Sequence, residues 1–170
     1  LKKTENLYPT EAKDLLNEGG KIVFIRHALA PGTGDPENFN LNDCSTQRNL
    51  SKEGVNQSKR IGLFFKKNNI KIHKVLSSEW CRCKDTAANA FQKYETLSAL
   101  NSFYDEKFAI NEKKQINELK KYIQNWNSRK NLVFITHYVV ISSILDIGVS
   151  SGEMIVVDKN LNYLGSVLLK

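Results

Sequence analysis

Two histidines in this sequence of 170 residues each lie one residue beyond a short apolar run. His27 comes after the letters IVFIR, so Arg26 is its neighbour, and His137 comes after LVFIT. A third polar group, SSEWCR, follows another apolar stretch and ends on Arg82. A neutral imidazole can attack phosphorus, and guanidinium groups match the oxygens of a phosphoryl group with paired N–H donors. These residue types together indicate chemistry on a phosphoryl group.

The apolar runs ahead of these polar groups have the composition of buried strands. Residues 22–25 and 132–136 are rich in β-branched and aromatic side chains, and a shorter run lies at 74–76. Continuous apolar runs are typical of strands that are covered on both faces of a parallel sheet. Such sheets bind ligands beyond the carboxyl ends of their strands. We therefore expect the three polar groups to meet in one crevice.

Helical patterns alternate with these strands. Thr10 is expected to cap a helix over residues 10–18 that a Gly-Gly pair ends, and Ser51 is expected to cap a helix that ends near Asn68. Between the capped segments, residues 28–49 show no sustained periodicity and are predicted to form a long loop. Long loops in compact domains usually serve a function. Further helices are predicted over residues 79–91, over 116–126 and from 138 onward.

The end of the sequence, MIVVDKNLNYLGSVLL, has the pattern of two strands joined by a polar turn at residues 159–162. Two strands joined in this way suit an antiparallel edge. Together with the alternating strands and helices, the pattern predicts one domain over residues 1–170. Its fold class is expected to be α/β: a three-layer α/β/α sandwich with a mostly parallel sheet and an antiparallel edge.

The formal net charge of +7 favours an anionic partner without identifying it. Short lysine runs lie between apolar positions at helical spacing, as on solvated helix faces. The sequence has neither an aromatic-rich ribonucleoprotein motif nor a recognition-helix pattern, so no nucleic-acid partner is expected. Because no apolar run approaches the roughly 20 residues of a spanning helix, no membrane span is expected either. The expected partner is a small phosphorylated substrate or a phosphoprotein, with the oligomeric state left open.

Four spaced motifs resemble those of the histidine phosphatase superfamily, which includes cofactor-dependent phosphoglycerate mutase and the acid phosphatases. Arg26-His27 resembles the Arg-His-Gly nucleophile motif, and RNLSKEGVNQS at 48–58 resembles Arg-x-Leu-Thr-x-x-Gly-x-x-Gln. SSEWCRCKDTA at 77–87 is similar to Ser-Ser-x-x-x-Arg-x-x-x-Thr-Ala, and Thr136-His137 to the second histidine. The motifs occur in the expected order and cover most of the chain.

This resemblance implies a phosphatase that hydrolyses a phosphate monoester through a phosphohistidine intermediate, with no metal and no cofactor. His27 would be the nucleophile. The resemblance assigns phosphate binding to Arg26, Arg48, Arg82 and His137, and His137 would also stabilise the charge that grows in the transition state. No carboxylate cluster accompanies these cationic residues, which supports the expectation that there is no metal site.

The chain departs from the family pattern at three places. Ala28 and Tyr138 replace the glycines that usually follow the two histidines, and both are expected to narrow the pocket. The general acid is the third departure. The family commonly uses a Glu between the second and third strands or an Asp after the second histidine, where Tyr138 stands. By location, Asp105 and Glu106 are the candidates, with an exposed loop carboxylate as the alternative for each.

The letters DCSTQRNLS and WCRC resemble a subgroup of small bacterial histidine phosphatases often made with a signal peptide. This resemblance implies that Cys44 pairs with Cys81 or Cys83 across the pocket rim; reduced thiols are the alternative. A Cys81–Cys83 bond is not expected, because side chains two apart on a helix diverge. The subgroup also implies a periplasmic or secreted location, with a cytoplasmic one as the alternative. The first residue is Leu1 rather than Met, as expected of a processed or trimmed chain.

Other functions stay open beside the leading one. A protein phosphohistidine phosphatase is the main alternative, because a leaving imidazole needs less help from an acid than an alkoxide does. A phosphomutase is less expected, since it needs an enclosing lid for which the chain has little length. A non-catalytic phosphate-binding module is also less expected, because Arg26, His27, Arg82 and His137 are intact. The loops over residues 28–47 and 92–115 would set the substrate.

Overall fold

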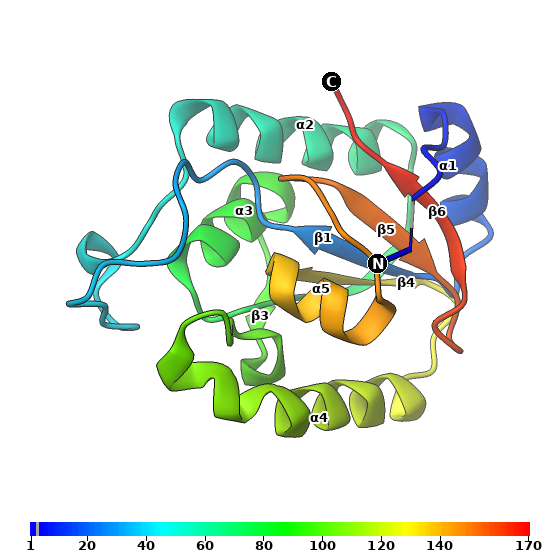
Figure 1. Cartoon of the computed structure of the whole chain (residues 1–170). Helices are drawn as coiled ribbons and strands as arrows, with labels where there is room; N and C mark the ends of the chain where they lie inside the picture. The colour runs from blue at the N-terminus through cyan, green and yellow to red at the C-terminus, as the bar shows by residue number, and fades with distance from the viewer. Residues whose placement is uncertain (3) are drawn as a thin grey trace.

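The computed structural model describes residues 1–2 and 4–170. A six-stranded sheet in the order β3-β2-β4-β1-β5-β6 lies at its centre (Figure 1). The four strands from β3 to β1 pair in parallel, whereas β5 and β6 pair antiparallel at one edge. The predicted, mostly parallel sheet with an antiparallel edge is therefore confirmed. Its strands are β1 (Ile22–Arg26), β2 (Ile72–Ser77), β3 (Glu95–Thr96), β4 (Asn131–Thr136), β5 (Met154–Val157) and β6 (Tyr163–Val167).

Helices cover both faces of this sheet, as Figure 1 shows, which confirms the predicted three layers. Helices α1, α2 and α3 pack on one face and α4 and α5 on the other. Within the described residues, no helix is long and apolar enough to cross a membrane. The α-helices are α1 (Pro9–Asn17), α2 (Lys52–Lys67), α3 (Cys81–Phe91), α4 (Glu112–Asn125) and α5 (Tyr138–Leu145). Three short 3-10 helices are η1 (Cys44–Thr46), η2 (Ser98–Leu100) and η3 (Glu106–Asn111).

The central strand β1 is buried on both faces. Ile22 and Phe24 join the apolar cluster under α4 and α5, whereas Val23 and Ile25 join the cluster under α1, α2 and α3. Successive side chains of a strand point to opposite faces, so an apolar run without alternation fits a strand that has helices on both sides. The strand can extend only as far as this cover does. It ends on Arg26, which is partly exposed.

The loop that follows β1 packs against the start of α2. The Ser51 hydroxyl accepts a hydrogen bond from the Gly54 N–H at 3.1 Å and caps the helix, as the sequence predicts. Gly54 lies so close to the Leu29 carbonyl that a Cβ at this position would overlap it. The Ser51 N–H also donates to the Leu29 carbonyl at 3.0 Å. These contacts fix the chain just after His27.

Two details differ from the sequence-based expectation. The prediction that Thr10 caps α1 was wrong; the helix begins at Pro9, and Tyr8 is its N-cap. Proline suits the first helical position, because its φ angle is fixed and its missing N–H has no helical partner there. Strand β3, whose two residues are both exposed, was not predicted at all. A strand this short and exposed has no apolar pattern to reveal it.

Candidate active site

The carboxyl ends of β1, β2 and β4 surround a pocket of about 250 Å³. His27 follows β1, Ser78 follows β2 and His137 follows β4, so the predicted convergence of these strand ends is confirmed. The His27 and His137 rings lie edge to face with their centroids 5.6 Å apart. The side chains that line the pocket include five of the predicted site residues: Arg26, His27, Arg48, Arg82 and His137.

His27 is held in one tautomer by two contacts. Its Nδ1 lies 2.8 Å from the Ala28 carbonyl oxygen, which can only accept, so the ring proton is on Nδ1. Its Nε2 then carries a lone pair and accepts from Arg82 Nε at 3.3 Å. Burial, followed by the charge of Arg82, lowers the pKa of His27 well below its ordinary value of 6.5. The ring is therefore neutral at physiological pH and presents a nucleophilic nitrogen.

His137 presents a different set of atoms. Its Nε2 lies 2.8 Å from the Ser78 hydroxyl, whose other acceptor, Asn101 Oδ1, is farther away at 3.3 Å. We infer that the Ser78 hydroxyl donates its hydrogen bond to Nε2, so Nε2 is the unprotonated nitrogen and the ring proton is on Nδ1. Burial, followed by the charge of Arg82, also lowers the pKa of His137 well below 6.5. Within the described residues, Nδ1 is buried and has no hydrogen-bond partner.

The three arginines are anchored by backbone carbonyls and by one carboxylate. Arg26 Nη1 donates to the Val149 carbonyl at 2.9 Å, and its guanidinium lies 5.4 Å from the ring centre of Tyr138. The Nε of Arg26 is buried with no partner among the described residues. Arg48 donates from Nε to the Gly34 carbonyl at 2.7 Å and from Nη1 to the Ala30 carbonyl. These anchors leave the Nε–H of Arg26 unpartnered among the described residues, and Arg26 lines the same pocket as His137.

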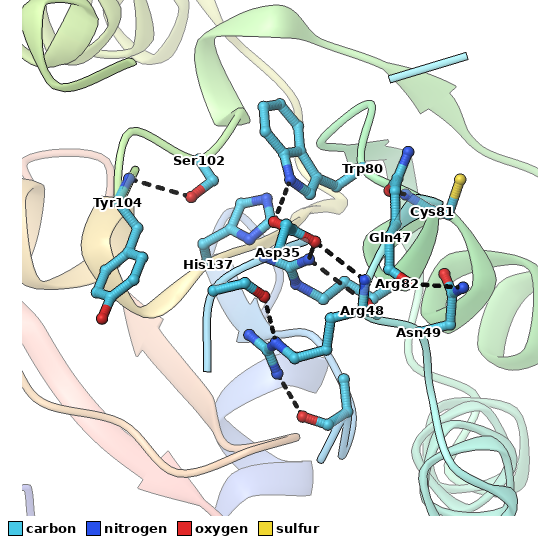
Figure 2. Close-up of polar contacts among 12 residues, drawn as sticks. Asp35, Gln47, Arg48, Asn49, Trp80, Cys81, Arg82, Ser102, Tyr104 and His137 are labelled. Carbon is cyan, nitrogen blue, oxygen red and sulfur yellow. Dashed lines mark hydrogen bonds and ion pairs between the residues drawn. The ribbon is translucent and has the colours of Figure 1, made fainter. Parts of the chain in front are cut away.

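Asp35 holds Arg82, and sequence reasoning missed it. Figure 2 shows its carboxylate at the centre of the polar network, bound to Trp80, Arg48 and Arg82. In the ion pair, Asp35 Oδ1 lies 2.8 Å from Arg82 Nη1. The Asp35 side chain is only 12% exposed and the Arg82 side chain 3%. Although burial raises the pKa of Asp35, the hydrogen bond from the Arg48 N–H and the charge of Arg82 outweigh it and lower this pKa. The only sequence signal was an acidic residue inside a loop between two cationic motifs.

A disulfide bond joins Cys44 to Cys81, which decides between the two pairings left open by the sequence. The bond attaches η1, in the long loop, to the first residue of α3. Beside it, the Gln47 side chain accepts from the Cys81 N–H at 2.9 Å. Cys83 is a free, buried thiol with its sulfur 3.5 Å from His137 Nε2, and burial raises its pKa to about 12. It therefore stays protonated at physiological pH.

The two acid candidates lie outside the residues that line the pocket. The Asp105 carboxylate accepts from the Lys107 N–H at 3.1 Å and caps η3, and Glu106 is exposed. Their role as general acid stays a prediction that this placement does not support. Tyr104 and Tyr138 line the pocket instead, so the residue that replaces the usual glycine after His137 does border the site.

The chain was also compared with known proteins. No protein-family model and no curated protein sequence matches it. Solved structures do match: the protein histidine phosphatase SixA complexed with tungstate superposes with a TM-score of 0.63 at 14% identity over 86% of this chain and 96% of that one. An open reading frame product from Mycobacterium tuberculosis gives 0.63 at 12% identity, over 80% of this chain and 89% of that one. A phosphoserine phosphatase from Entamoeba histolytica in complex with 3-phosphoglyceric acid superposes with a TM-score of 0.59 at 15% identity, over 80% of this chain and 89% of that one.

At these identities the likeness concerns the fold. The chain has the α/β fold of solved histidine phosphatases, so the structural side of the resemblance implied by its motifs is confirmed. In the part of the chain that the structure describes, no three His, Cys, Asp or Glu side chains gather closely enough to hold a metal ion.

Proposed function

We propose that this chain, folded like the histidine phosphatases, is a phosphatase that cleaves a phosphate monoester through a phosphohistidine at His27. One observation carries the proposal: a nucleophilic nitrogen and two buried, unpartnered N–H donors belong to described residues that line the same pocket. The nitrogen is His27 Nε2, and the donors are His137 Nδ1 and Arg26 Nε. Buried donors without partners are costly, and a phosphoryl group would supply acceptors for both.

The reaction would proceed in two displacements at phosphorus. In the first, the lone pair of His27 Nε2 forms the P–N bond while the ester P–O bond breaks, and the leaving oxygen departs with its electron pair and takes up a proton. The imidazole gains positive charge, which the Ala28 carbonyl stabilises through Nδ1–H. In the second, a water attacks phosphorus, the P–N bond breaks, and inorganic phosphate and neutral His27 result, with the water proton released to solvent or phosphate.

Arg26, Arg48, Arg82 and His137 would hold the phosphoryl oxygens during both steps. Guanidinium forks offer paired donors at fixed geometry, and the His137 Nδ1–H adds one donor from the carboxyl end of the neighbouring strand β4. None of these steps calls for a metal ion. The same residues would stabilise the extra charge on the equatorial oxygens in the transition state.

A protein phosphohistidine phosphatase is the second candidate. Among the described residues, those that line the pocket include no carboxylate, so they offer no strong acid for the leaving group. A leaving imidazole needs less protonation than an alkoxide, which suits such a site. One of the matching structures is that of a protein histidine phosphatase, and the tungstate complexed with it is a tetrahedral oxyanion.

A periplasmic or secreted location is the compartment that we propose. Disulfide bonds persist in oxidising compartments and are rare in the cytosol, so the Cys44–Cys81 bond supports this location.

The direct test is hydrolysis of an aryl phosphate with and without a chelator, followed by trapping of the enzyme. Protein labelled by a ³²P-phosphorylated substrate and quenched in alkali should retain label that acid removes, as expected of phosphohistidine. The His27→Ala variant should retain none. Parallel assays with phosphohistidine and phosphoserine peptides would separate the two candidate functions, since only the first should turn over if the leaving group must be an imidazole. Label that survives in His27→Ala would overturn the proposed nucleophile.

A further inference from the structure

The Asp35 carboxylate receives three hydrogen bonds, two of them from Arg48 and Arg82, which line the pocket. Oδ1 accepts from Arg82 Nη1 at 2.8 Å and from the Arg48 N–H at 3.0 Å, and Oδ2 accepts from Trp80 Nε1 at 3.1 Å. Figure 2 shows these contacts meeting at one carboxylate. Both oxygens are therefore engaged by donors. A carboxylate in this position acts as a fixed anion, and no proton is available on it for a leaving group.

The orientation of Arg82 depends on this contact. The guanidinium directs Nε at His27 Nε2, 3.3 Å away, while Nη1 on its other side is bound by Asp35. Planar guanidinium groups pair their donors in a fixed geometry, so fixing Nη1 also fixes the direction of Nε–H. The Arg48 carbonyl, 3.4 Å from Nη1, is the only further acceptor for that nitrogen among the described contacts.

Asp35 also changes the charge of the site. Arg26, Arg48 and Arg82 bring three positive charges, both imidazoles are neutral, and Asp35 removes one charge, which leaves a net charge of two. A phosphate monoester carries close to two negative charges at neutral pH. The pocket is therefore matched in charge to a dianionic phosphoryl group.

We propose that Asp35 is a positioning residue that orients Arg82 toward His27 and sets the charge of the site. The proposal rests on the phosphatase function proposed above. Asp35 belongs to the same long loop that the Cys44–Cys81 bond ties to α3, the helix that carries Arg82. The bond therefore links the two segments that carry the partners of the ion pair.

Two variants separate geometry from charge. Asp35→Asn keeps the shape and one acceptor but removes the charge, whereas Asp35→Glu keeps the charge and displaces the carboxylate. Glu37→Gln is the matched control, because Glu37 is an exposed carboxylate of the same loop. The measurements are kcat and KM on an aryl and an alkyl phosphate, binding of inorganic phosphate by calorimetry at low ionic strength, and the thermal midpoint of unfolding.

Both Asp35 variants should lose kcat by roughly 10- to 100-fold with a much smaller change in KM, because a small misplacement of a transition-state group acts mainly on turnover. Asp35→Asn should bind inorganic phosphate at least about two-fold more tightly than wild type, since one positive charge is no longer offset. Asp35→Glu should bind it as wild type does. A purely structural role would instead lower kcat, phosphate affinity and thermal midpoint together in both variants.

Three results would overturn the inference. One is kcat in both variants within about two-fold of the Glu37→Gln control. Another is a joint decrease of kcat, phosphate affinity and thermal midpoint in both variants, which a purely structural role would produce. The last is a loss confined to alkyl phosphates, which would make Asp35 a proton donor. If wild type itself cleaves no phosphate ester, the proposed function fails, and the calorimetric comparison of Asp35→Asn with wild type still tests the effect of Asp35 on charge.

Discussion

Arg82 Nε lies 3.3 Å from His27 Nε2 and donates its proton to the lone pair that would attack phosphorus. One contact therefore keeps the imidazole in the reactive tautomer and disfavours its protonation. An incoming phosphoryl group would offer Arg82 a better, anionic acceptor. The Nε–H would then donate its hydrogen bond to a phosphoryl oxygen instead of to His27, and the lone pair of His27 Nε2 would become available for attack. The proposed nucleophile and the proposed phosphate-binding arginine are thus hydrogen-bonded to each other in the free protein.

Removal of the nucleophile is expected to abolish turnover. The His27→Ala variant lacks the nitrogen that forms the P–N bond, yet the strand that leads to it is held by β4 and β5 and should still fold. Activity on an aryl phosphate and the circular dichroism spectrum should be measured on the same sample. His27→Gln, which retains more of the buried volume, provides a control for packing. Near-wild-type activity in either folded variant would contradict the mechanism.

The pH dependence should reflect the buried imidazoles. Burial, followed by the charge of Arg82, lowers the pKa of His27 and His137 well below 6.5. Since neutral His27 is the proposed attacking form, kcat at saturating substrate should stay level as pH falls through 6.5 and decline only below it. Proton NMR of the ring C–H signals checks both histidines directly. Titration of His27 at or above 6.5 would be inconsistent with this prediction.

The same shifts predict how stability depends on pH. In the unfolded chain these imidazoles take up protons near 6.5, whereas in the folded protein they remain neutral to lower pH. Below 6.5 the unfolded state therefore binds more protons, and the free energy of unfolding should fall as pH falls. Urea unfolding on both sides of pH 6.5 measures this change. The slope should be smaller in a His137→Gln variant, which lacks one of the two groups.

The geometry of the guanidinium groups should matter beyond their charge. Arg82→Lys keeps the charge but loses the paired donors that bind Asp35 and His27. Loss of charged hydrogen bonds of about 1.5–3 kcal/mol corresponds to a fall in kcat/KM of roughly 10- to 100-fold. Arg60→Lys, on the exposed side of α2, is the matched control and should show no loss. If the two variants had equal kcat/KM values, Arg82 would not be a phosphate-binding residue.

Reduction of the disulfide should destabilise the protein. In the chain-entropy description, a bond that closes a loop of 37 residues contributes about 3–4 kcal/mol. Cys44→Ser should lower the free energy of unfolding by a similar amount and raise KM, because the loop that anchors Arg48 and Asp35 loses its link to α3. Dithiothreitol should reproduce both effects in wild type. A further effect of dithiothreitol on Cys44→Ser would point to a different thiol.

Substrates with different leaving groups test the general acid. Asp105 caps η3 and Glu106 is exposed, and neither lines the pocket, so Asp105→Asn and Glu106→Gln should slow alkyl and aryl phosphates equally or not at all. The measurement is kcat/KM on both substrate types in each variant. A selective loss on alkyl phosphates, of about 10²- to 10⁴-fold, would instead identify the acid.

Much of the fold could be predicted because buried strands consist of apolar residues, which form recognisable runs in the sequence. The runs that became β1 and β4 are apolar at almost every position, since both of their faces are covered, and each leads to a histidine. A largely parallel sheet puts the carboxyl ends of its strands at one edge, and the direct pairing of β1 with β4, which the sequence did not predict, then places His27 next to His137. The convergence of the strand ends therefore follows from composition and order alone.

The rest depends on contacts between distant segments. Asp35 meets Arg82 and Trp80 only after the long loop has folded onto α3, and no periodicity in that loop indicates its path. Tyr104 borders the pocket for the same reason, because an irregular segment carries it there. The cysteine pairing was likewise open until the geometry placed Cys81 rather than Cys83 beside Cys44.

The Cys44–Cys81 bond also bears on how fast substrate arrives. A long loop that is covalently tied to α3 cannot swing open as a lid, so we expect no opening step before substrate passes this loop. Association should then follow diffusion and the attraction between the cationic pocket and an anionic ligand, and its rate constant should fall steeply as salt is added. In the reduced protein the loop gains freedom, and loop ordering would become a separate, salt-insensitive phase of binding.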